Sequence, residues 1–356
     1  MTTHYNDYLY SNKTVFGIKS DSSRYAWASY YLLILISSLV GDTIILIASW
    51  KYRAFRLHKI VVVTIQHIAF CDLMVTVSNV VSNVVTIIRN EWVLGDFLCY
   101  LRPYTGYYLP VVSVLLICNM TTSKLILLKY PLRSETITVK KAHLFCGASW
   151  LAALILPVTA LFVNVLDGND IYFSYKTYYC DLGFTANIWD WLKPLLAVIV
   201  LFTPNCLVVF TTIYLLIIAK QVARGGQTSL KWQGIITTVL TASTYCISIL
   251  PTVVFNVGEA VFTVDDPSKS FFHTSYFRIA DSILYLNTIS NFYIYSLSIP
   301  SFREFIKSSI HQSYRMFSLT TTSTSENHGM GIMFSSIFDN TSSKVLKKFL
   351  KLFSLI

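Results

Sequence analysis

Asp72 and His67 are ionisable side chains inside an apolar run of the chain, where a charge is costly. Asp72 ends the run Ile68-Ala69-Phe70-Cys71-Asp72, and His67 comes directly before it. A carboxylate in such surroundings has to hold a proton, bind a cation or accept several hydrogen bonds. His67 has no evident catalytic partner in the sequence, so we expect it to be a packing residue whose hydrogen bonds are satisfied.

No motif of a hydrolytic enzyme accompanies these residues. The sequence contains neither the His-Glu-x-x-His of zinc proteases nor the Gly-x-Ser-x-Gly of serine hydrolases. We therefore expect a protein that is not an enzyme and has no organic cofactor.

The segments that carry these residues have the composition of a membrane protein. The 356 residues are 54% hydrophobic and 13% charged, whereas about a quarter of the residues in an ordinary soluble domain are charged. Seven continuous apolar stretches are long enough to cross a hydrocarbon core of about 30 Å as helices. They are 27–50, 61–88, 98–128, 144–162, 195–219, 234–262 and 279–297. These stretches predict an all-α membrane protein with a seven-transmembrane helix bundle.

The charges of the connections predict the orientation of the bundle. The first, third and fifth connections carry eleven Lys and Arg residues, whereas the second, fourth and sixth carry three, together with seven acids. Positive residues favour the cytoplasmic side of a membrane. We therefore expect a multi-pass protein of the plasma membrane with an extracellular N-terminus and a cytoplasmic C-terminus. The basic residues behind the net charge of +10 then face the anionic lipid of the bilayer. Nucleic acid is therefore not an expected partner.

The chain divides into four parts on this interpretation. Residues 1–26 form a polar extracellular segment without the apolar region of a signal peptide, and residues 27–299 form the transmembrane domain. We expect a short amphipathic helix at 300–315 on the inner leaflet and a mostly disordered cytoplasmic tail at 316–356. Asn12-Lys13-Thr14 is a candidate N-glycosylation site in the first part.

Two of the seven cysteines lie where an oxidising compartment can reach them. Cys99 lies at the outer end of the third stretch and Cys180 in the long fourth connection. A disulfide between them would hold this connection over the bundle. Two free thiols are the alternative.

The order of further motifs resembles the rhodopsin-like (class A) family of G-protein-coupled receptors. Cys99 and Lys124 have the spacing of the family's third-helix cysteine and basic residue, and Asp72 matches its second-helix aspartate. Asn291-Phe292-Tyr293-Ile294-Tyr295 resembles the seventh-helix Asn-Pro-x-x-Tyr. The other matching positions are Gly41-Asp42, Tyr130-Pro131-Leu132, Trp150, Pro204, Pro251 and Phe302-Arg303. The resemblance covers residues 27 to about 310 and implies a cell-surface receptor that binds an extracellular ligand and activates a heterotrimeric G protein.

The resemblance also implies an ion site around Asp72. Ser113, Asn287 and Asn291 occupy positions that surround a sodium ion together with this aspartate in the family, and oxygen ligands suit a hard cation. A structural sodium ion at Asp72 is therefore expected. The alternative is a polar cluster filled with water, because Asp42 replaces the family's asparagine and can compete for the same partners.

The resemblance assigns a second group of residues to G-protein coupling. These are Lys124, Leu125, Pro131, Lys231 and Tyr295. Ser123-Lys124-Leu125 replaces the family's Asp-Arg-Tyr, and Lys231 stands where many relatives carry a glutamate. Two lysines would repel each other where an ion pair normally forms, so we expect a weakly held resting state with ligand-free signalling. A receptor that couples poorly, or a decoy, is the rival interpretation.

Two ligand classes are disfavoured because their essential residue is absent. Gly106 replaces the third-helix aspartate of amine receptors, and Tyr285 replaces the retinal-binding lysine of opsins. The outer halves of the helices instead carry tyrosines and charges of both signs, which suit a peptide. The expected ligand residues are Arg102, Tyr107, Tyr108, Asn256, Glu259, Arg278, Asp281 and Tyr285.

Several alternatives stay open at this point. Small polar molecules sensed by a chemosensory receptor are a second ligand class. The charges could also form internal bridges, Arg102 with Asp281 or Glu259 with Arg278. A transporter is the main different class, but the odd number of helices and the absence of an evident repeat argue against it. Phosphorylation of the Ser/Thr-rich segment 318–325 would add arrestin as a partner.

Overall fold

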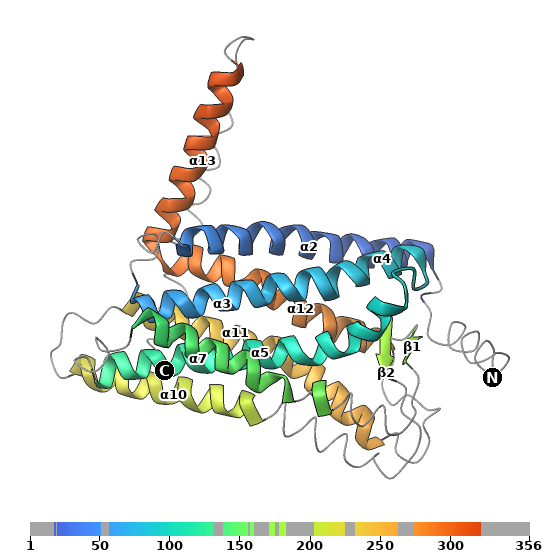
Figure 1. The fold of residues 1–356 in the computed structure, drawn as a ribbon, viewed down its shortest axis with the longest axis horizontal. Helices are drawn as coiled ribbons and strands as arrows, with labels where there is room; N and C mark the ends of the chain where they lie inside the picture. The colour runs from blue at the N-terminus through green and yellow to red at the C-terminus, as the bar shows by residue number, and fades with distance from the viewer. Residues whose placement is uncertain are drawn as a thin grey trace.

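Seven helical segments run side by side along one axis in the computed structural model (Figure 1). The residues that the structure describes are 18, 20–50, 57–130, 138–155, 157–159, 171–174, 178–182, 203–224, 232–262 and 274–321. The helices of the bundle are α2 (Asp21–Trp50), α3 (Lys59–Val75) continued by η1 (Thr76–Val80) and α4 (Val81–Arg89), α5 (Asp96–Lys129), α7 (Val139–Ala153), α10 (Thr203–Arg224), α11 (Trp232–Phe262) and α12 (Thr274–Ser298). The predicted seven-helix bundle is confirmed.

Six of the described helical spans are long and apolar enough to cross a membrane. The seventh, α12, is more polar, and it completes the bundle by packing between α11 and α2. Large apolar side chains cover the outside of the bundle, for example Leu33 at 65% and Ile247 at 70% exposure. Polar side chains such as Asp42, Asp72 and Asn291 are buried inside. This inverted arrangement is expected of a protein whose solvent is lipid.

The helix boundaries differ from the predicted ones mainly at their ends. Helix α2 begins at Asp21 rather than at 27, because Asp21 in the first turn favours the positive helix terminus and pairs with Arg24 at 2.8 Å. Helix α10 is described from Thr203, and the predicted start of this helix at 195 lies outside the described residues. Hydropathy alone does not locate these ends.

The second membrane helix contains a π-helical turn that the sequence analysis missed. Between α3 and α4, η1 interrupts the regular hydrogen bonds, and the N–H of Thr76 points to the carbonyls of both Asp72 and Leu73. A π-helical turn changes the direction of all side chains that follow it. In α4, Ser82, Asn83 and Thr86 consequently face the interior of the bundle.

Helix α13 (Pro300–Thr321) follows α12 and projects away from the bundle, transverse to the bundle axis (Figure 1). Phe302 and Ile306 are buried against the bundle, and Arg303 donates to the carbonyls of Ser296 and Leu297 at 3.2 Å each. A helix is present at the predicted position, and it ends at Thr321, six residues beyond the expected end at 315. No glycine or proline follows Pro300 within these residues, so nothing in the sequence ends the helix earlier.

A two-stranded antiparallel hairpin lies at the opposite end of the bundle from α13 (Figure 1). It consists of β1 (Ile171–Ser174) and β2 (Tyr179–Leu182), with Phe173 opposite Cys180. The sequence analysis predicted a connection here but no strands. We call the end of the bundle with the hairpin the disulfide end, and the other the α13 end.

Candidate functional site

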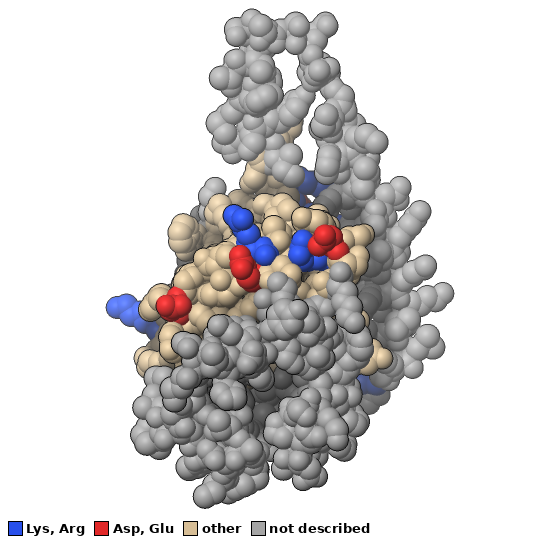
Figure 2. Space-filling view, turned by 90° about the vertical axis from the view of Figure 1, so that its right-hand side faces the viewer, with Lys and Arg blue, Asp and Glu red and all other residues tan. Residues whose placement is uncertain are grey.

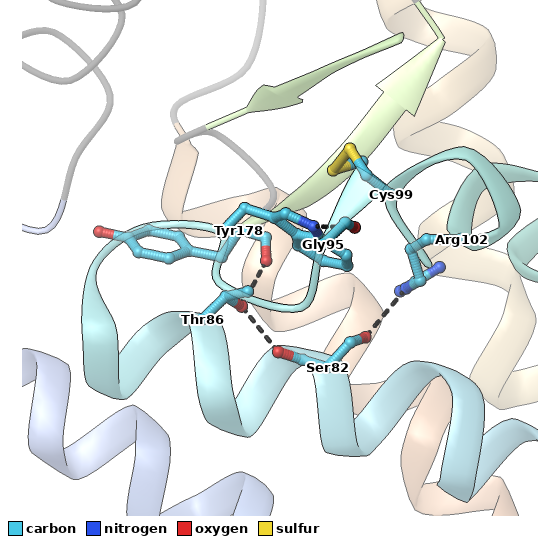
Figure 3. The surroundings of a disulfide bond; sticks show 8 residues. Ser82, Thr86, Gly95, Cys99, Arg102 and Tyr178 are labelled. Atoms are coloured by element: carbon cyan, nitrogen blue, oxygen red, sulfur yellow. Dashed lines mark hydrogen bonds between the residues drawn. A yellow bond between two sulfur atoms is a disulfide. The ribbon is translucent and has the colours of Figure 1, made fainter. Parts of the chain in front are cut away.

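A disulfide fixes the hairpin to the bundle. Cys99 in the first turn of α5 is bonded to Cys180 in β2, with the two Cα atoms 5.2 Å apart. The predicted pairing is confirmed, and strand β2 is held against α5 (Figure 3). The loop residues next to Cys180 are therefore held over the helix ends.

Tyr178, just before β2, is a second attachment of this loop. Its backbone adopts a left-handed conformation with φ of 62°, which is unfavourable for a tyrosine. The carbonyl of Tyr178 accepts from the Thr86 hydroxyl at 2.7 Å (Figure 3). Its hydroxyl donates to Asn90 at 3.0 Å and accepts from the N–H of Ile18 at 2.9 Å. Burial raises the pKa of Tyr178, so this phenol keeps the proton that it donates.

Arg102 lies one turn along α5 from the disulfide and is only 4% exposed. Its Nε donates to the Ser82 hydroxyl at 3.3 Å (Figure 3), and its Nη2 donates to the Tyr285 hydroxyl at 2.9 Å. The guanidinium carbon lies 4.2 Å from the centre of the Tyr179 ring, a cation–π distance. Residues of α4, α12 and β2 thus hold one guanidinium of α5 in place.

The structure brings part of the predicted ligand residues together. Arg102 contacts Tyr285, whose ring also lies 6.1 Å from that of Tyr31, and Arg278 lies 5.5 Å from the ring centre of Tyr178. Charged side chains of both signs lie on the described part of this end (Figure 2). The predicted mixture of charge and tyrosine is therefore present.

Other predicted ligand residues lie elsewhere or outside the described part. Tyr108 donates to the carbonyl of Trp150 at 3.1 Å and so faces α7 rather than Arg102. Tyr107 is half-buried in α5, and Asp281 is half-buried in α12. The side chains of Asn256 and Glu259 lie outside the described residues, so the bridge of Glu259 with Arg278 stays a prediction.

Several residues of this site were not identified from the sequence. Ser82, Tyr178 and Tyr179 contact the arginines, but none of them belongs to a family motif. The two tyrosines directly precede Cys180, so the predicted disulfide was a signal that could have located them. Ser82 could not be placed without the π-helical turn that precedes it.

Asp72 forms the centre of a buried polar cluster. Its Oδ2 accepts from the amide of Asn291 at 2.7 Å, so this predicted neighbour is brought into contact. The other two expected neighbours make different contacts: Ser113 pairs with the thiol of Cys71 at 3.3 Å, and Ser290 approaches the amide oxygen of Asn287 at 3.5 Å.

A second buried carboxylate, Asp42, joins the same cluster through hydroxyl groups. Ser38 donates to Asp42 at 2.7 Å and lies 2.6 Å from the hydroxyl of Thr76. Thr76 in turn contacts the carbonyl of Asp72 at 2.8 Å. Neither Ser38 nor Thr76 was identified from the sequence.

Two oxygens of this cluster are acceptors without a donor. Oδ1 of Asp42 and Oδ1 of Asn291 are buried and have no hydrogen-bond partner within the described part of the chain. Buried acceptors of this kind require a donor or a cation. Because the cluster offers carboxylate, amide and hydroxyl oxygens, its chemistry fits a hard cation such as sodium.

Lys124 lies at the α13 end and is buried between α5 and α11, with 8% exposure. Its ammonium group lies so close to Gly234 of α11 that any side chain at position 234 would overlap it. Leu125, the next residue, packs against a small apolar cluster. The cluster consists of Leu215, Ala219, Ile235 and Val239. Of the other predicted coupling residues, Tyr295 is fully buried, and Pro131 and Lys231 lie outside the described residues.

Phe292, which replaces the family's seventh-helix proline, joins three helices at this end. A Cβ atom on Gly41 of α2 would lie 3.0 Å from Cβ of Phe292, so the two helices approach closely because residue 41 is a glycine. The Phe292 ring also meets the Phe302 ring of α13 edge to face, with centroids 6.2 Å apart. The sequence identified the replacement but not this role.

His67 has the satisfied hydrogen bonds that the sequence analysis expected. The indole N–H of Trp150 donates to Nδ1 of His67 at 3.2 Å. The proton of a neutral His67 is then on Nε2, which lies 3.1 Å from Nδ1 of His143. His67 therefore links α3 to α7 as a packing residue.

Comparison with known proteins agrees with this architecture. The family described as 7 transmembrane receptor (rhodopsin family) matches residues 41–295. A QRFP-like peptide receptor of Branchiostoma floridae is 22% identical over 136 residues, which are 38% of this chain and 35% of the relative. An octopamine receptor beta-2R of Chilo suppressalis is 24% identical over 154 residues, 42% and 38% of the two chains. A cysteinyl leukotriene receptor 1 of Cavia porcellus is 24% identical over 159 residues, 43% and 45%.

The matched segments span less than half the length of each of these relatives. The family match is broader, because it extends from Gly41 to Tyr295. This range includes the disulfide, the Asp72 cluster and Lys124. The chain thus belongs to the rhodopsin family of seven-transmembrane receptors, a family of membrane receptors and not of enzymes.

Proposed function

We propose that this protein is a receptor of the plasma membrane that binds an extracellular peptide and activates a heterotrimeric G protein. The disulfide end faces the outside, where a disulfide is stable, and the α13 end faces the cytosol, as the positive charge of the connections at that end favours. The observation that carries the proposal is the pair of buried arginines, Arg102 and Arg278, under a covalently fixed loop.

The residues around Arg102 support a peptide as the ligand. Tyrosine rings and guanidinium groups recognise peptides through both apolar contact and hydrogen bonds. The QRFP-like relative is named as a peptide receptor. The octopamine relative is a weaker guide to the ligand, because position 106, where amine receptors carry an aspartate, is a glycine that borders the positive charge of Arg102.

Signal transfer to the G protein uses the α13 end. Lys124 lies where α5 meets α11, and separation of these two helices would uncover its ammonium group. Residues Lys124, Leu125, Pro131, Lys231 and Tyr295 contribute to the cytoplasmic coupling surface on this proposal. Phosphorylation of segment 318–325 then adds arrestin as a second partner.

A sodium ion in the Asp72 cluster belongs to the same proposal. The acceptors without a donor, Oδ1 of Asp42 and Oδ1 of Asn291, support a cation there. An ion bound to the resting arrangement of α3 and α12 would stabilise that arrangement over one in which Asn291 has moved away from Asp72.

The proposal can be tested in membranes from cells that express the full chain. We expect nucleotide exchange on a co-expressed G protein that exceeds the exchange in membranes without the receptor, and a further increase with a member of a peptide library. Lys124→Ala should reduce this exchange, whereas Lys141→Ala, at an exposed position of the same end, should leave it unchanged. An antibody against an N-terminal tag should bind intact cells.

Three results would point to other functions. Surface expression without exchange on any G protein would support a decoy receptor. A response to small polar metabolites but to no peptide would support a chemosensory receptor. Uptake of a solute that needs no G protein would contradict the receptor proposal and support a transporter.

A further inference from the structure

We propose that the ligand carries a carboxylate that binds the guanidinium of Arg102. This inference rests on the proposed function as a ligand-binding receptor and names the chemical group that the site selects. The chemistry is that of an organic acid, whether a small molecule or the free C-terminus of a peptide.

The first argument is the absence of a carboxylate in direct contact. The hydrogen bonds of Arg102 go to the hydroxyls of Ser82 and Tyr285, and its cation–π contact is with Tyr179. All three partners are neutral, and within the described residues the charge of Asp281 acts on this guanidinium only from beyond ion-pair distance. A buried positive charge without a paired carboxylate is destabilising, because its loss of hydration is only partly offset. An anionic ligand would supply the missing ion pair.

The second argument is the direction of the remaining donor group. Nε and Nη2 are used by Ser82 and Tyr285, whereas Nη1 has no hydrogen-bond partner within the described part of the chain. Nη1 is not completely buried, so it remains accessible to a ligand. A Cβ atom on Gly106 would lie 2.8 Å from it. The missing side chain of Gly106 therefore leaves room beside Nη1 for an atom of the ligand.

The third argument is that the guanidinium is already oriented. Residues from α4, α12 and β2 hold it, and the disulfide fixes β2 in turn. A carboxylate accepts hydrogen bonds from a guanidinium in a defined plane. Because the side chain is held before the ligand arrives, little conformational entropy is lost on binding. The same arrangement repels a cationic amine.

The test measures thermal unfolding of the purified full-length receptor in lipid nanodiscs, so that it needs no G protein. The probes are phenylacetate, its neutral counterpart phenylacetamide and the cation phenethylamine. A second pair is the dipeptide Gly-Phe with a free C-terminal carboxyl group and with a carboxamide. We expect the two acids to raise the unfolding temperature and the amide and amine forms to leave it unchanged.

Both acid arms support a carboxylate, and their comparison identifies its source. A larger shift with Gly-Phe than with phenylacetate indicates the C-terminus of a peptide, and the reverse indicates a small organic acid. Equal shifts for acids and amides, or no shift with any acid, would overturn the inference.

Variants separate an ion-pairing role of Arg102 from a structural one. Arg102→Gln should weaken acid binding by about tenfold or more, as expected for loss of a charge-assisted pair. Without a probe it should unfold at the same or a higher temperature, because the buried charge is gone. The matched control is Arg89→Gln, which removes an exposed arginine from the same end. A lower unfolding temperature for Arg102→Gln, with the acid shift intact, would contradict the proposal.

A second variant supplies the carboxylate from within the protein. Gly106→Asp places an acid beside Nη1, and the flexible end of Arg102 can shift to accommodate it. We expect this variant to unfold at a higher temperature than the wild type and to ignore phenylacetate. A full response to phenylacetate in Gly106→Asp would contradict the assigned position of the ligand.

These outcomes are distinguishable from failure of the proposed function. A receptor that binds acids but activates no G protein would retain the carboxylate site and lose the signalling proposal. A receptor that signals equally well with Arg102→Gln would retain the signalling proposal and lose the carboxylate site.

Discussion

Both ends of the bundle bury cations, but Arg102 at the disulfide end and Lys124 at the α13 end are held differently. At the disulfide end, Arg102 is fixed by hydroxyls and a tyrosine ring from three other elements, one of which is crosslinked to α5. At the α13 end, Lys124 occupies space that exists only because residue 234 is a glycine. The first arrangement is directional and covalently supported, whereas the second depends on close contact between two helices.

This difference indicates that the two ends have different functions. A planar guanidinium in a fixed plane can recognise a ligand group, whereas a flexible ammonium between two helices can be released when they separate. At the α13 end, Phe292 packs closely beside Gly41 and makes an edge-to-face ring contact with Phe302, so packing alone supports this end. We therefore expect the disulfide end to change little during signalling and the α13 end to open.

The largest expected effect comes from removing the covalent support of the disulfide end. Cys99→Ser or Cys180→Ser should each lower the free energy of unfolding by about 2–5 kcal/mol, the usual range for a native disulfide. The double variant should be no less stable than either single one, because all three lack the same bond. Thermal unfolding of the purified protein measures this.

The control for this experiment is Cys206→Ser, at a free and exposed cysteine, which should change stability little. If the double variant were much less stable than both single variants, the two cysteines would act separately, and the disulfide would not be the main support of this end.

The next effect should appear at the α13 end. Gly234→Ala introduces a methyl group into the space of the Lys124 ammonium, so the end of this lysine has to leave its position between α5 and α11. Because the flexible end of Lys124 can shift, we expect a cost in stability of about 1 kcal/mol or less, together with a several-fold rise in ligand-free nucleotide exchange. Both are measured on the purified receptor with a G protein.

Gly147→Ala is the matched control, because a Cβ atom there meets nothing within 4 Å. Alanine is a better helix former than glycine by about 1 kcal/mol, so this variant should be neutral or stabilised. Equal behaviour of the two alanine variants would show that the contact of Lys124 with Gly234 does not hold the resting state.

Some of these features could be predicted from the sequence, and others could not. The bundle, the amphipathic helix and the Cys99–Cys180 bond were predictable, because hydropathy, loop charge and cysteine placement are properties of the chain itself. The direction of Ser82 was not, because it depends on one π-helical turn whose residues, Thr76–Val80, contain no glycine or proline to indicate it. The role of Gly234 was not predictable either, since it depends on how closely two helices approach.

The Asp72 cluster lies between the two ends, and its replacement has a moderate expected effect. Asp72→Asn removes the main carboxylate near Asn291, so sodium should no longer stabilise the receptor. We expect the wild type to unfold at a higher temperature in sodium chloride than in choline chloride at equal ionic strength, and the variant to show no difference. Asp42→Asn restores the residue type found in related receptors and should keep the sodium effect. Loss of the effect in Asp42→Asn but not in Asp72→Asn would contradict this assignment.

The smallest expected effect distinguishes the covalent from the hydrogen-bonded support of the disulfide end. Thr86→Val removes the donor to the Tyr178 carbonyl and should cost about 1 kcal/mol, the usual net value of one hydrogen bond. Thr288→Val is the control, because that hydroxyl bonds only within its own helix, to the carbonyl of Tyr285. Since Thr86 and Cys180 hold the same loop, the cost of Thr86→Val should fall once Cys180→Ser has released it. Additive costs in the double variant would mean that the loop stays in place through Thr86 without its disulfide, and that the two ends of the bundle differ less than their bonding suggests.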